Sequence, residues 1–203
     1  GKLRAVSSDA IIISYEYDSN VKQNLYIIDK IEDVYNKITN SNKKIAIIGL
    51  GTSNIPLIEY FYNTKSIVSV FDNRELDQLD ESTVELINKY NIKYYLGKNN
   101  LKHLVGFDYI YRSPSCRPDT PEIVEAINNG AVLTSEIEKV LELTPSTVVG
   151  ITGSDGKTTT TSLIYEIIKQ SGKKCYLGGN IGLPLFTKVR EMTPEDVVVL
   201  ELS

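Results

Sequence analysis

The stretch GITGSDGKTTTT, residues 150–161, lies between a short apolar run and a helical pattern, and it constrains the fold more than any other part of the chain. The run TVVGI before it has the β-branched composition of a strand. The segment after it places apolar residues on one helical face and ends at Gly172. These apolar positions are Leu163, Ile164, Ile167 and Ile168. A strand, a glycine-rich turn and a helix together predict a unit of a parallel α/β sheet.

The glycine-rich turn has the composition of a phosphate-binding loop. Glycines let successive backbone N–H groups point at one anion, and the helix N-terminus adds unpaired donors and partial positive charge. Lys157 has the charge and length to reach terminal phosphates, and the Thr158 hydroxyl suits Mg²⁺. The spacing is G-x-x-G-x-x-G-K-T, because Ile151 stands at the first glycine of the strict P-loop pattern. The alternative is a turn that only caps a helix, but the lysine and threonines favour a nucleotide.

Glu201 is the candidate carboxylate for a divalent ion between phosphates. It ends the apolar run VVVL, and parallel strands bring their carboxyl ends to the same edge of a sheet as the loop. The alternative is a solvated carboxylate at a strand end. Because Glu201 stands two residues from the end of the sequence, we expect fraying there and no neighbouring strand to hold its side chain.

Short apolar runs alternate with helical patterns over residues 43–143. The runs are apolar at consecutive positions, which is typical of parallel strands buried on both faces. The pattern predicts a Rossmann-like, doubly wound parallel sheet. The expected strands are residues 44–49, 66–72, 92–97, 108–114 and 131–134, and the expected helices are residues 55–62, 83–90 and 121–128.

A second α/β unit begins after the polar stretch ELTPST, and residues 144–203 are predicted to be a P-loop ATP-binding domain. Its expected strands are 147–151, 173–178 and 197–201, with a further helix near 185–192. Because a sheet usually has about five or six strands, we expect the chain to stop inside this domain. Residues 1–42 are an uncertain N-terminal segment, in which residues 11–17 suit a strand and 25–38 a helix.

The stretch GLGTSN, residues 49–54, also follows an expected strand and opens an expected helix, and Asp72 ends the next strand. This arrangement resembles the dinucleotide fingerprint G-x-G-x-x-G, except that Asn54 stands at the third glycine. From these residues alone, a nucleotide site and a plain structural turn both stay open.

Composition argues against several classes of protein. The net charge of -4 and the scattered lysines give no positive surface for nucleic acid. The apolar runs are much too short to span a bilayer and no signal pattern opens the chain, so we expect a cytoplasmic protein. Cys116 and Cys175 lack metal-ligand spacing and are expected to be reduced structural thiols, and His103 is expected at the surface.

Three stretches together resemble the ATP-binding central domain of the Mur ligases: the loop at 150–161, GGNIGLPLF at 178–186 and VVLELS at 198–203. GLGTSN followed by Asp72 is similar to the UDP-binding first domain of the D-glutamate-adding branch of that family. The resemblance covers residues 43–203 and is much more specific than any single motif.

The resemblance implies an ATP-dependent ligase of peptidoglycan precursor synthesis, with ATP and Mg²⁺ as cofactors. Its partners would be UDP-N-acetylmuramoyl-L-alanine and D-glutamate, with no nucleic acid and no membrane insertion, and the enzyme would be a monomer. ATP would phosphorylate the substrate carboxylate, and the amine of D-glutamate would attack the acyl phosphate. Family members continue into a further domain that helps to bind ATP and the amino acid, so this chain is expected to be a fragment that is inactive alone.

Carried over residue by residue, the resemblance assigns a role to each matching position. The catalytic residues are Lys157 and Glu201, and the metal ligands are Thr158 and Glu201. The ATP-binding residues are Gly153, Ser154, Asp155, Gly156, Lys157, Thr158 and Thr159. The residues that bind the UDP substrate are Gly51, Thr52, Ser53, Asn54, Asp72, Arg74, Ser113 and Asn180. Two positions depart from the family: Asp155 stands where Asn is common, and Ser115 replaces the glycine of a Ser/Thr-Pro-Gly segment.

Two other functions fit parts of the sequence. A nicotinamide-dependent oxidoreductase built on GLGTSN would leave the lysine and threonines of the phosphate loop without a role. A non-catalytic nucleotide-binding module would need no complete active site.

Overall fold

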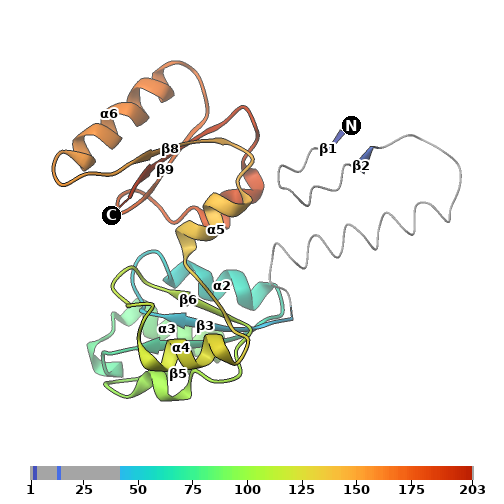
Figure 1. Ribbon diagram of the computed structural model, residues 1–203, viewed down its shortest axis with the longest axis vertical. Helices are drawn as coiled ribbons and strands as arrows, with labels where there is room; N and C mark the ends of the chain where they lie inside the picture. Colours follow the sequence, from blue (N-terminus) through green and yellow to red (C-terminus); the bar gives the residue numbers. More distant parts are fainter. Residues whose placement is uncertain (1, 4–12, 15–41, 203) are drawn as a thin grey trace, which may run out of the picture.

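The computed structural model describes residues 2–3, 13–14 and 42–202, and it contains two larger parallel sheets (Figure 1). Near the N-terminus, β1 (Lys2–Leu3) and β2 (Ile13–Ser14) pair antiparallel. The strand expected at 11–17 is therefore described only at these two residues of β2, and the helix expected at 25–38 lies outside the described residues.

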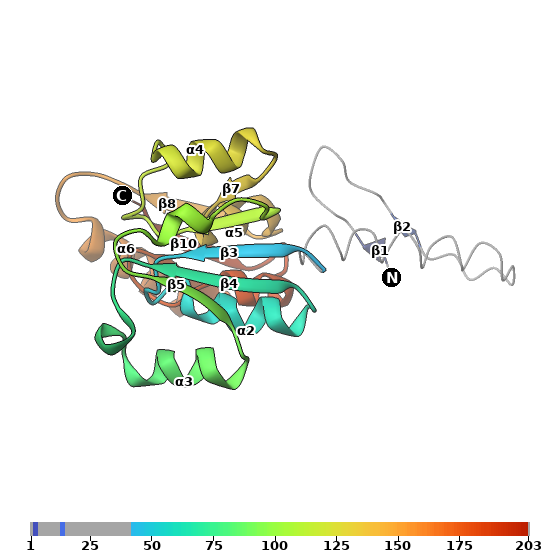
Figure 2. The same ribbon diagram turned by 90° about the horizontal axis from the view of Figure 1, so that it is seen from below.

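The first sheet has five parallel strands in the order β5-β4-β3-β6-β7. Its strands are β3 (Lys44–Ile48), β4 (Ile67–Asp72), β5 (Lys93–Leu96), β6 (Tyr109–Arg112) and β7 (Val132–Thr134). Its helices are α2 (Ile55–Asn63), α3 (Glu81–Lys89) and α4 (Pro121–Asn128), with short 3₁₀ helices η1 (Leu76–Gln78) and η2 (Asn100–His103). Helices α2 and α3 lie on one face and α4 on the other (Figure 2), so the predicted doubly wound sheet is confirmed.

Burial explains why these strands were readable in the sequence. Every residue of β3 and β4 after the first is buried, and the apolar ones belong to one of the two cores that flank the sheet. Strand β5 differs from the prediction of strands buried on both faces, because Lys93 and Tyr94 are exposed. It lies at the edge of the sheet, where one side of the strand has no neighbour.

The second sheet consists of β8 (Thr147–Ile151), β9 (Cys175–Gly179) and β10 (Val197–Glu201), all parallel, in the order β8-β10-β9. The last strand in the sequence is thus the middle strand, and all five of its residues are buried. The expectation that no neighbouring strand would hold Glu201 is wrong, because Glu201 pairs with Ile151 on one side and Gly179 on the other. The order of these strands in the sheet therefore differs from their order along the chain.

The helices of the second unit also differ in part from the sequence prediction. Helix α6 (Lys157–Gln170) follows the glycine loop as expected, but Leu163 and Ile167 of its apolar face are exposed. The segment expected as a helix near 185–192 forms a 3₁₀ helix, η3 (Phe186–Glu191). In the part of the chain that the structure describes, no helix is long and apolar enough to cross a membrane.

Helix α5 (Glu136–Leu143) was not predicted, and it lies between the two sheets (Figure 1). It begins directly after β7, where the Ser135 hydroxyl accepts a hydrogen bond from the Glu138 N–H at 3.3 Å and caps the helix. Beside it, Phe186 of η3 inserts among three rings of the first unit, with ring centroids 5.0 to 6.0 Å apart. These rings are Tyr60, Phe61 and Tyr111. One hydrophobic core therefore joins the two units.

Candidate functional site

The turn GLGTSN begins where the strand order of the first sheet reverses, between β3 and β6. Ligands of open parallel sheets bind at this position, beyond the carboxyl ends of the strands. Gly49 has a φ of +83°, and a Cβ there would lie 2.5 Å from Ser113 Oγ. Glycine is therefore required for the loops after β3 and β6 to approach each other.

Asn54, which replaces the third glycine of the fingerprint, closes the turn from inside. Its side chain is 2% exposed, and Nδ2 donates to the carbonyl oxygens of Ile48 and Gly49 at 3.0 Å each. The asparagine thus satisfies two carbonyls at the end of β3, and its amide nitrogen is already engaged within the turn.

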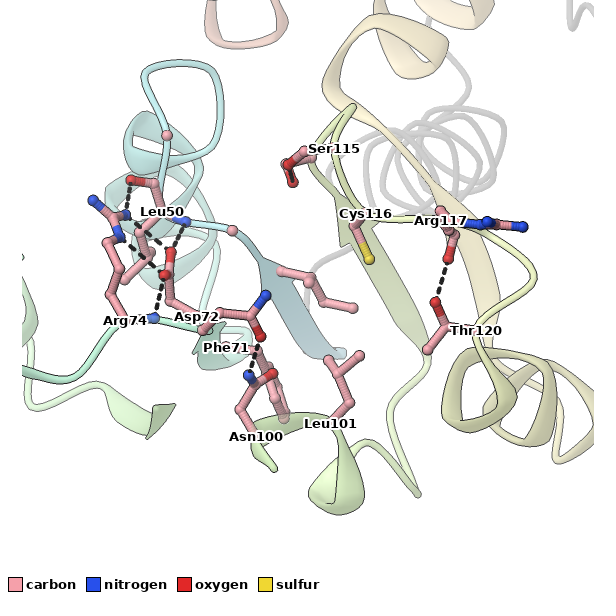
Figure 3. Close-up of a pocket in the computed structure, with 15 residues that line it drawn as sticks. Leu50, Phe71, Asp72, Arg74, Asn100, Leu101, Ser115, Cys116, Arg117 and Thr120 are labelled. Atoms are coloured by element: carbon pink, nitrogen blue, oxygen red, sulfur yellow. Dashed lines mark hydrogen bonds and ion pairs between the residues drawn. The ribbon is translucent and has the colours of Figure 1, made fainter. Parts of the chain in front are cut away.

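Asp72 and Arg74 fix the other side of the turn (Figure 3). Asp72 Oδ2 accepts from the Leu50 N–H at 2.7 Å, and Arg74 Nη2 donates to Asp72 Oδ2 and to Leu50 O at 2.9 Å each. Arg74 Nε also donates to Asp72 Oδ1 at 3.0 Å. Burial raises the pKa of Asp72, but the hydrogen bonds from Arg74 and Leu50 outweigh it, so the pKa lies below its ordinary value. Asp72 and Arg74 therefore hold the turn as well as facing the site.

A cavity of about 540 Å³ opens between this turn and the loops after β5 and β6. It contains four of the residues predicted to bind UDP, namely Gly51, Asp72, Arg74 and Ser113. The remaining polar lining was not predicted, and Asn73, Asn100, Cys116, Arg117 and Thr120 contribute to it. Asn100 is buried and donates through Nδ2 to Asn73 Oδ1 at 2.9 Å, which orders one wall of the cavity.

We expect Asp72→Asn to lower the free energy of unfolding by about 1–3 kcal/mol at pH 7, because hydrogen bonds to a charged group become bonds to a neutral one. Since the folded-state pKa of Asp72 is lowered, its contribution is present above the unfolded-state pKa and is lost as the pH falls through the folded value. Urea unfolding at neutral and acid pH measures both effects, with Asp77→Asn on the exposed η1 as the control. If the difference in free energy of unfolding between the wild type and Asp72→Asn does not shrink at acid pH, this role of Asp72 is contradicted.

A second cavity, of about 550 Å³, lies between the two units. From the first unit it is lined by the turn residues 51–54, by Arg112 to Ser115 and by Ser135 to Glu138. From the second unit it is lined by Gly179, Asn180, Glu201 and Leu202. The fold thus brings predicted substrate-binding residues from both units to one cavity, including Thr52, Ser53, Asn54, Ser113 and Asn180.

The phosphate loop has the predicted strand–turn–helix form. Gly156 adopts a φ of +72° as the residue before α6, and Lys157 is the first residue of the helix. In this structure Lys157 Nζ donates to Gly153 O at 2.7 Å and to Ser154 O at 3.3 Å, so the ammonium lies over the loop. The residues predicted to bind ATP, 153–159, line neither of the two cavities, and those of the loop itself, 153–156, are exposed.

Glu201 fits a role as a metal ligand better than the solvated carboxylate that the sequence left open. It is 5% exposed, and among the described residues its Oε2 is buried without a hydrogen-bond partner. A carboxylate oxygen in this state costs free energy unless a cation or donor joins it. The described residues contain no group of three His, Cys, Asp or Glu side chains placed to hold an ion. Mg²⁺ at Glu201 would therefore take its other ligands from Thr158, phosphate oxygens and water.

The GGNIG segment places Asn180 beside Glu201 by folding back on the second sheet. Gly179 has a φ of +92°, and a Cβ there would overlap Glu201 O. The Asn180 N–H donates to the same carbonyl at 2.9 Å. Only glycine allows this close approach, so Gly179 is explained by geometry as well as by the family pattern.

We expect Gly179→Ala to lower the free energy of unfolding by more than about 3 kcal/mol, because the new Cβ meets backbone in a left-handed conformation. Gly172→Ala is the matched control: its φ is +85°, but nothing lies within 4 Å of the added Cβ. Urea unfolding of both variants separates backbone strain from overlap. Equal losses in the two variants would contradict the proposed close approach.

Glu136 lines the second cavity, and it was not predicted as a site residue. In the sequence it is indistinguishable from an ordinary acidic residue in the first turn of a helix. It is 6% exposed, and its Oε1 accepts from the Leu185 N–H at 2.6 Å and the Phe186 N–H at 2.7 Å. Burial raises the pKa of Glu136 above its ordinary value, although these two donors act in the opposite direction. Its carboxylate therefore bridges the two units.

Comparison with known proteins identifies both units. The model of the Mur ligase MurD-like N-terminal domain matches residues 43–135, and that of the Mur ligase middle domain matches residues 151–203. The UDP-N-acetylmuramoylalanine–D-glutamate ligase of Ruminiclostridium cellulolyticum is 50% identical over 162 residues, which are 80% of this chain and 35% of that protein. The ligase of the same name from Acetivibrio thermocellus is 47% identical over 174 residues, which are 86% of this chain and 37% of that protein.

Among solved structures, a murein peptide ligase from Psychrobacter arcticus matches 78% of this chain and 37% of its own, with a TM-score of 0.46 and 19% identity. The chain spans about a third of the length of the two curated relatives. The family models between them cover parts of both units, including the turn GLGTSN at residues 49–54, called the nucleotide turn below, and the phosphate loop from residue 151. The chain belongs to the Mur ligase family, with a MurD-like N-terminal domain followed by a region of the Mur ligase middle domain.

Proposed function

We propose that this chain is the substrate-binding and phosphate-binding part of a ligase that joins D-glutamate to UDP-N-acetylmuramoyl-L-alanine with ATP. The observation that carries the proposal is the second cavity, where the nucleotide turn of the first unit faces Asn180 and Glu201 of the second. A substrate whose UDP end occupies the first unit would present its other end to the second. The names of the relatives supply the substrate class.

The predicted catalytic and metal-binding residues would each have a role in this chemistry. Lys157 and the amides of the loop would bind the ATP phosphates, and Thr158 and Glu201 would hold Mg²⁺, which neutralises phosphate charge. The substrate carboxylate would attack the terminal phosphorus of ATP, and ADP would leave. The amine of D-glutamate would then attack the acyl carbon, and the resulting tetrahedral intermediate would lose phosphate and a proton to give the amide. Positioning and charge neutralisation are sufficient for both steps, so no nucleophilic side chain is required.

The site assignments extend over both cavities. The UDP part would contact Gly51, Thr52, Ser53, Asp72 and Arg74, and the muramoyl part would contact Asn180. We propose that residues 43–143 form the UDP-binding domain and 144–203 belong to the ATP-binding domain. The ligase would act as a monomer in the cytoplasm, without nucleic acid or membrane insertion.

Calorimetric titration of this chain with UDP and, separately, with NAD⁺ tests the nucleotide assignment. UDP should bind saturably, and Asp72→Ala should weaken it, because the side chain that holds Leu50 and Arg74 is lost. Binding of NAD⁺ without binding of UDP would support the oxidoreductase alternative instead.

A further inference from the structure

The segment 179–186 lies between the two units and is held at both ends. At its start, the Asn180 N–H donates to Glu201 O at 2.9 Å in the second sheet. At its end, the Leu185 and Phe186 N–H groups donate to Glu136 Oε1 at 2.6 and 2.7 Å. Glu136 belongs to α5, the helix that follows the last strand of the first sheet, so the far end of the segment is tied to the other unit.

If position 136 only had to fill space between the units, an apolar side chain would do so at a lower free-energy cost than the carboxylate of Glu136. Glu136 is 6% exposed, and burying a charge costs more free energy than burying an apolar side chain of similar size. Its two donors are the amides at the start of η3, where Leu185 precedes the helix and has no side-chain cap of its own. A single acceptor oxygen therefore fixes the direction of the backbone at this point, which an apolar contact would not do.

The position of segment 179–186 affects the second cavity, because the segment includes Asn180. Asn180 and Glu201 line the second cavity, and so does Glu136 itself. Phe186, whose N–H the carboxylate accepts, also packs against Tyr60 of the first unit with ring centroids 5.0 Å apart. A shift of η3 away from α5 would therefore move segment 179–186, which includes Asn180, relative to the nucleotide turn.

We infer that Glu136 is a positioning residue. By accepting hydrogen bonds from the two amides at the end of segment 179–186, it holds Asn180 at the distance from the nucleotide turn that the UDP substrate requires. This role rests on the proposed function and deepens it. In this role Glu136 would act through segment 179–186, and its contact with the Leu185 and Phe186 amides is the observation that supports it. The acceptor oxygen is the essential feature, so Gln at this position should replace Glu, whereas Ala should not.

The first experiment measures hydrogen exchange of the Leu185 and Phe186 amides in the 203-residue chain. Glu136→Ala should speed their exchange at least about tenfold, because the oxygen that accepts both hydrogen bonds is lost. In Glu136→Gln the exchange rates of the two amides should stay near those of the wild type, because the acceptor oxygen is kept. Glu142→Ala is the matched control, since Glu142 lies on the same helix and is exposed. In the described part of the chain its carboxylate accepts from the neighbouring Lys139 Nζ, at 2.6 Å.

The second experiment measures steady-state kinetics in a full-length ligase that contains this sequence. Glu136→Ala should raise the KM for UDP-N-acetylmuramoyl-L-alanine about tenfold and leave the KM for ATP within about twofold, because only the substrate contact is displaced. Glu136→Gln should restore the wild-type KM. A merely structural role would lower the active fraction, and hence kcat, and would move neither KM.

Unchanged exchange of the two amides in Glu136→Ala would overturn the inference, and so would an unchanged KM for the UDP substrate or the same changes in Glu142→Ala. If the wild-type ligase makes no amide at all, the proposed function fails. The exchange result then still decides whether Glu136 holds the segment.

Discussion

Lys157→Ala should lower the turnover of a full-length ligase containing this sequence by about 10²–10³-fold, the usual loss when one preorganised electrostatic contact to a reacting group is removed. Lys157 is the one side chain of residues 150–161 with a full positive charge. In the structure its ammonium lies over the loop, with Gly153 O at 2.7 Å and Ser154 O at 3.3 Å. Phosphate oxygens would take the place of these carbonyls, so the variant loses charge stabilisation of the transferring phosphoryl group.

The measurement is the initial rate of phosphate release at saturating ATP, UDP substrate and D-glutamate. Lys169→Ala is the matched control, because Lys169 lies near the other end of α6 and has a loose ion pair with Glu166 at 3.9 Å. Its turnover should equal that of the wild type. Near-normal turnover of Lys157→Ala would remove the lysine from the catalytic assignment.

Glu201→Gln should lower turnover by about 10²-fold or more, because a metal ligand that neutralises phosphate charge is lost. Folding stability should be unchanged or slightly higher. The reason is that Glu201 is 5% exposed with Oε2 unpartnered, so its charge costs free energy in the absence of a cation. Loss of activity without loss of stability separates a ligand from a structural carboxylate.

Thermal unfolding with and without Mg²⁺ and ATP supplies the second readout. The wild type should be stabilised by the pair of ligands and Glu201→Gln should not, since binding to the folded state stabilises it by mass action. Glu195→Gln, an exposed residue shortly before β10, is the control and should behave as the wild type. A marked destabilisation of Glu201→Gln, with normal response to Mg²⁺, would contradict the metal assignment.

Strands β3, β4 and β10 could be predicted because they are buried along almost their whole length and form continuous apolar runs in the sequence. The glycine turns could be predicted because backbone geometry demands glycine there, as the φ of +83° at Gly49 illustrates. Helix α5 was missed although the sequence signals it: Ser135 precedes it as a capping residue, and Ile137, Val140 and Leu141 stand at helical spacing. The 3₁₀ form of η3 could not be predicted either, because the packing of this segment depends on contacts of Phe186 with aromatic rings of the first unit.

The candidate site was predictable where it follows motifs and unpredictable where it depends on contacts between distant residues. Asp72 and the turn were found from their spacing after strands. The burial of Glu201 was missed, because strand order in the second sheet brings β10 between β8 and β9. Glu136 was missed for a similar reason: its two partners lie 49 and 50 residues away, and no local pattern marks a carboxylate that caps another helix.

The most direct test of the account is product analysis of a full-length ligase that contains this sequence, incubated with UDP-N-acetylmuramoyl-L-alanine, ATP, Mg²⁺ and D-glutamate. The account predicts one new UDP-sugar product whose mass has risen by one glutamyl residue, with ADP and phosphate formed in equal amounts and only when every substrate is present. Absence of that product from a folded protein that binds UDP, or ATP hydrolysis that does not depend on D-glutamate and the UDP substrate, would contradict it.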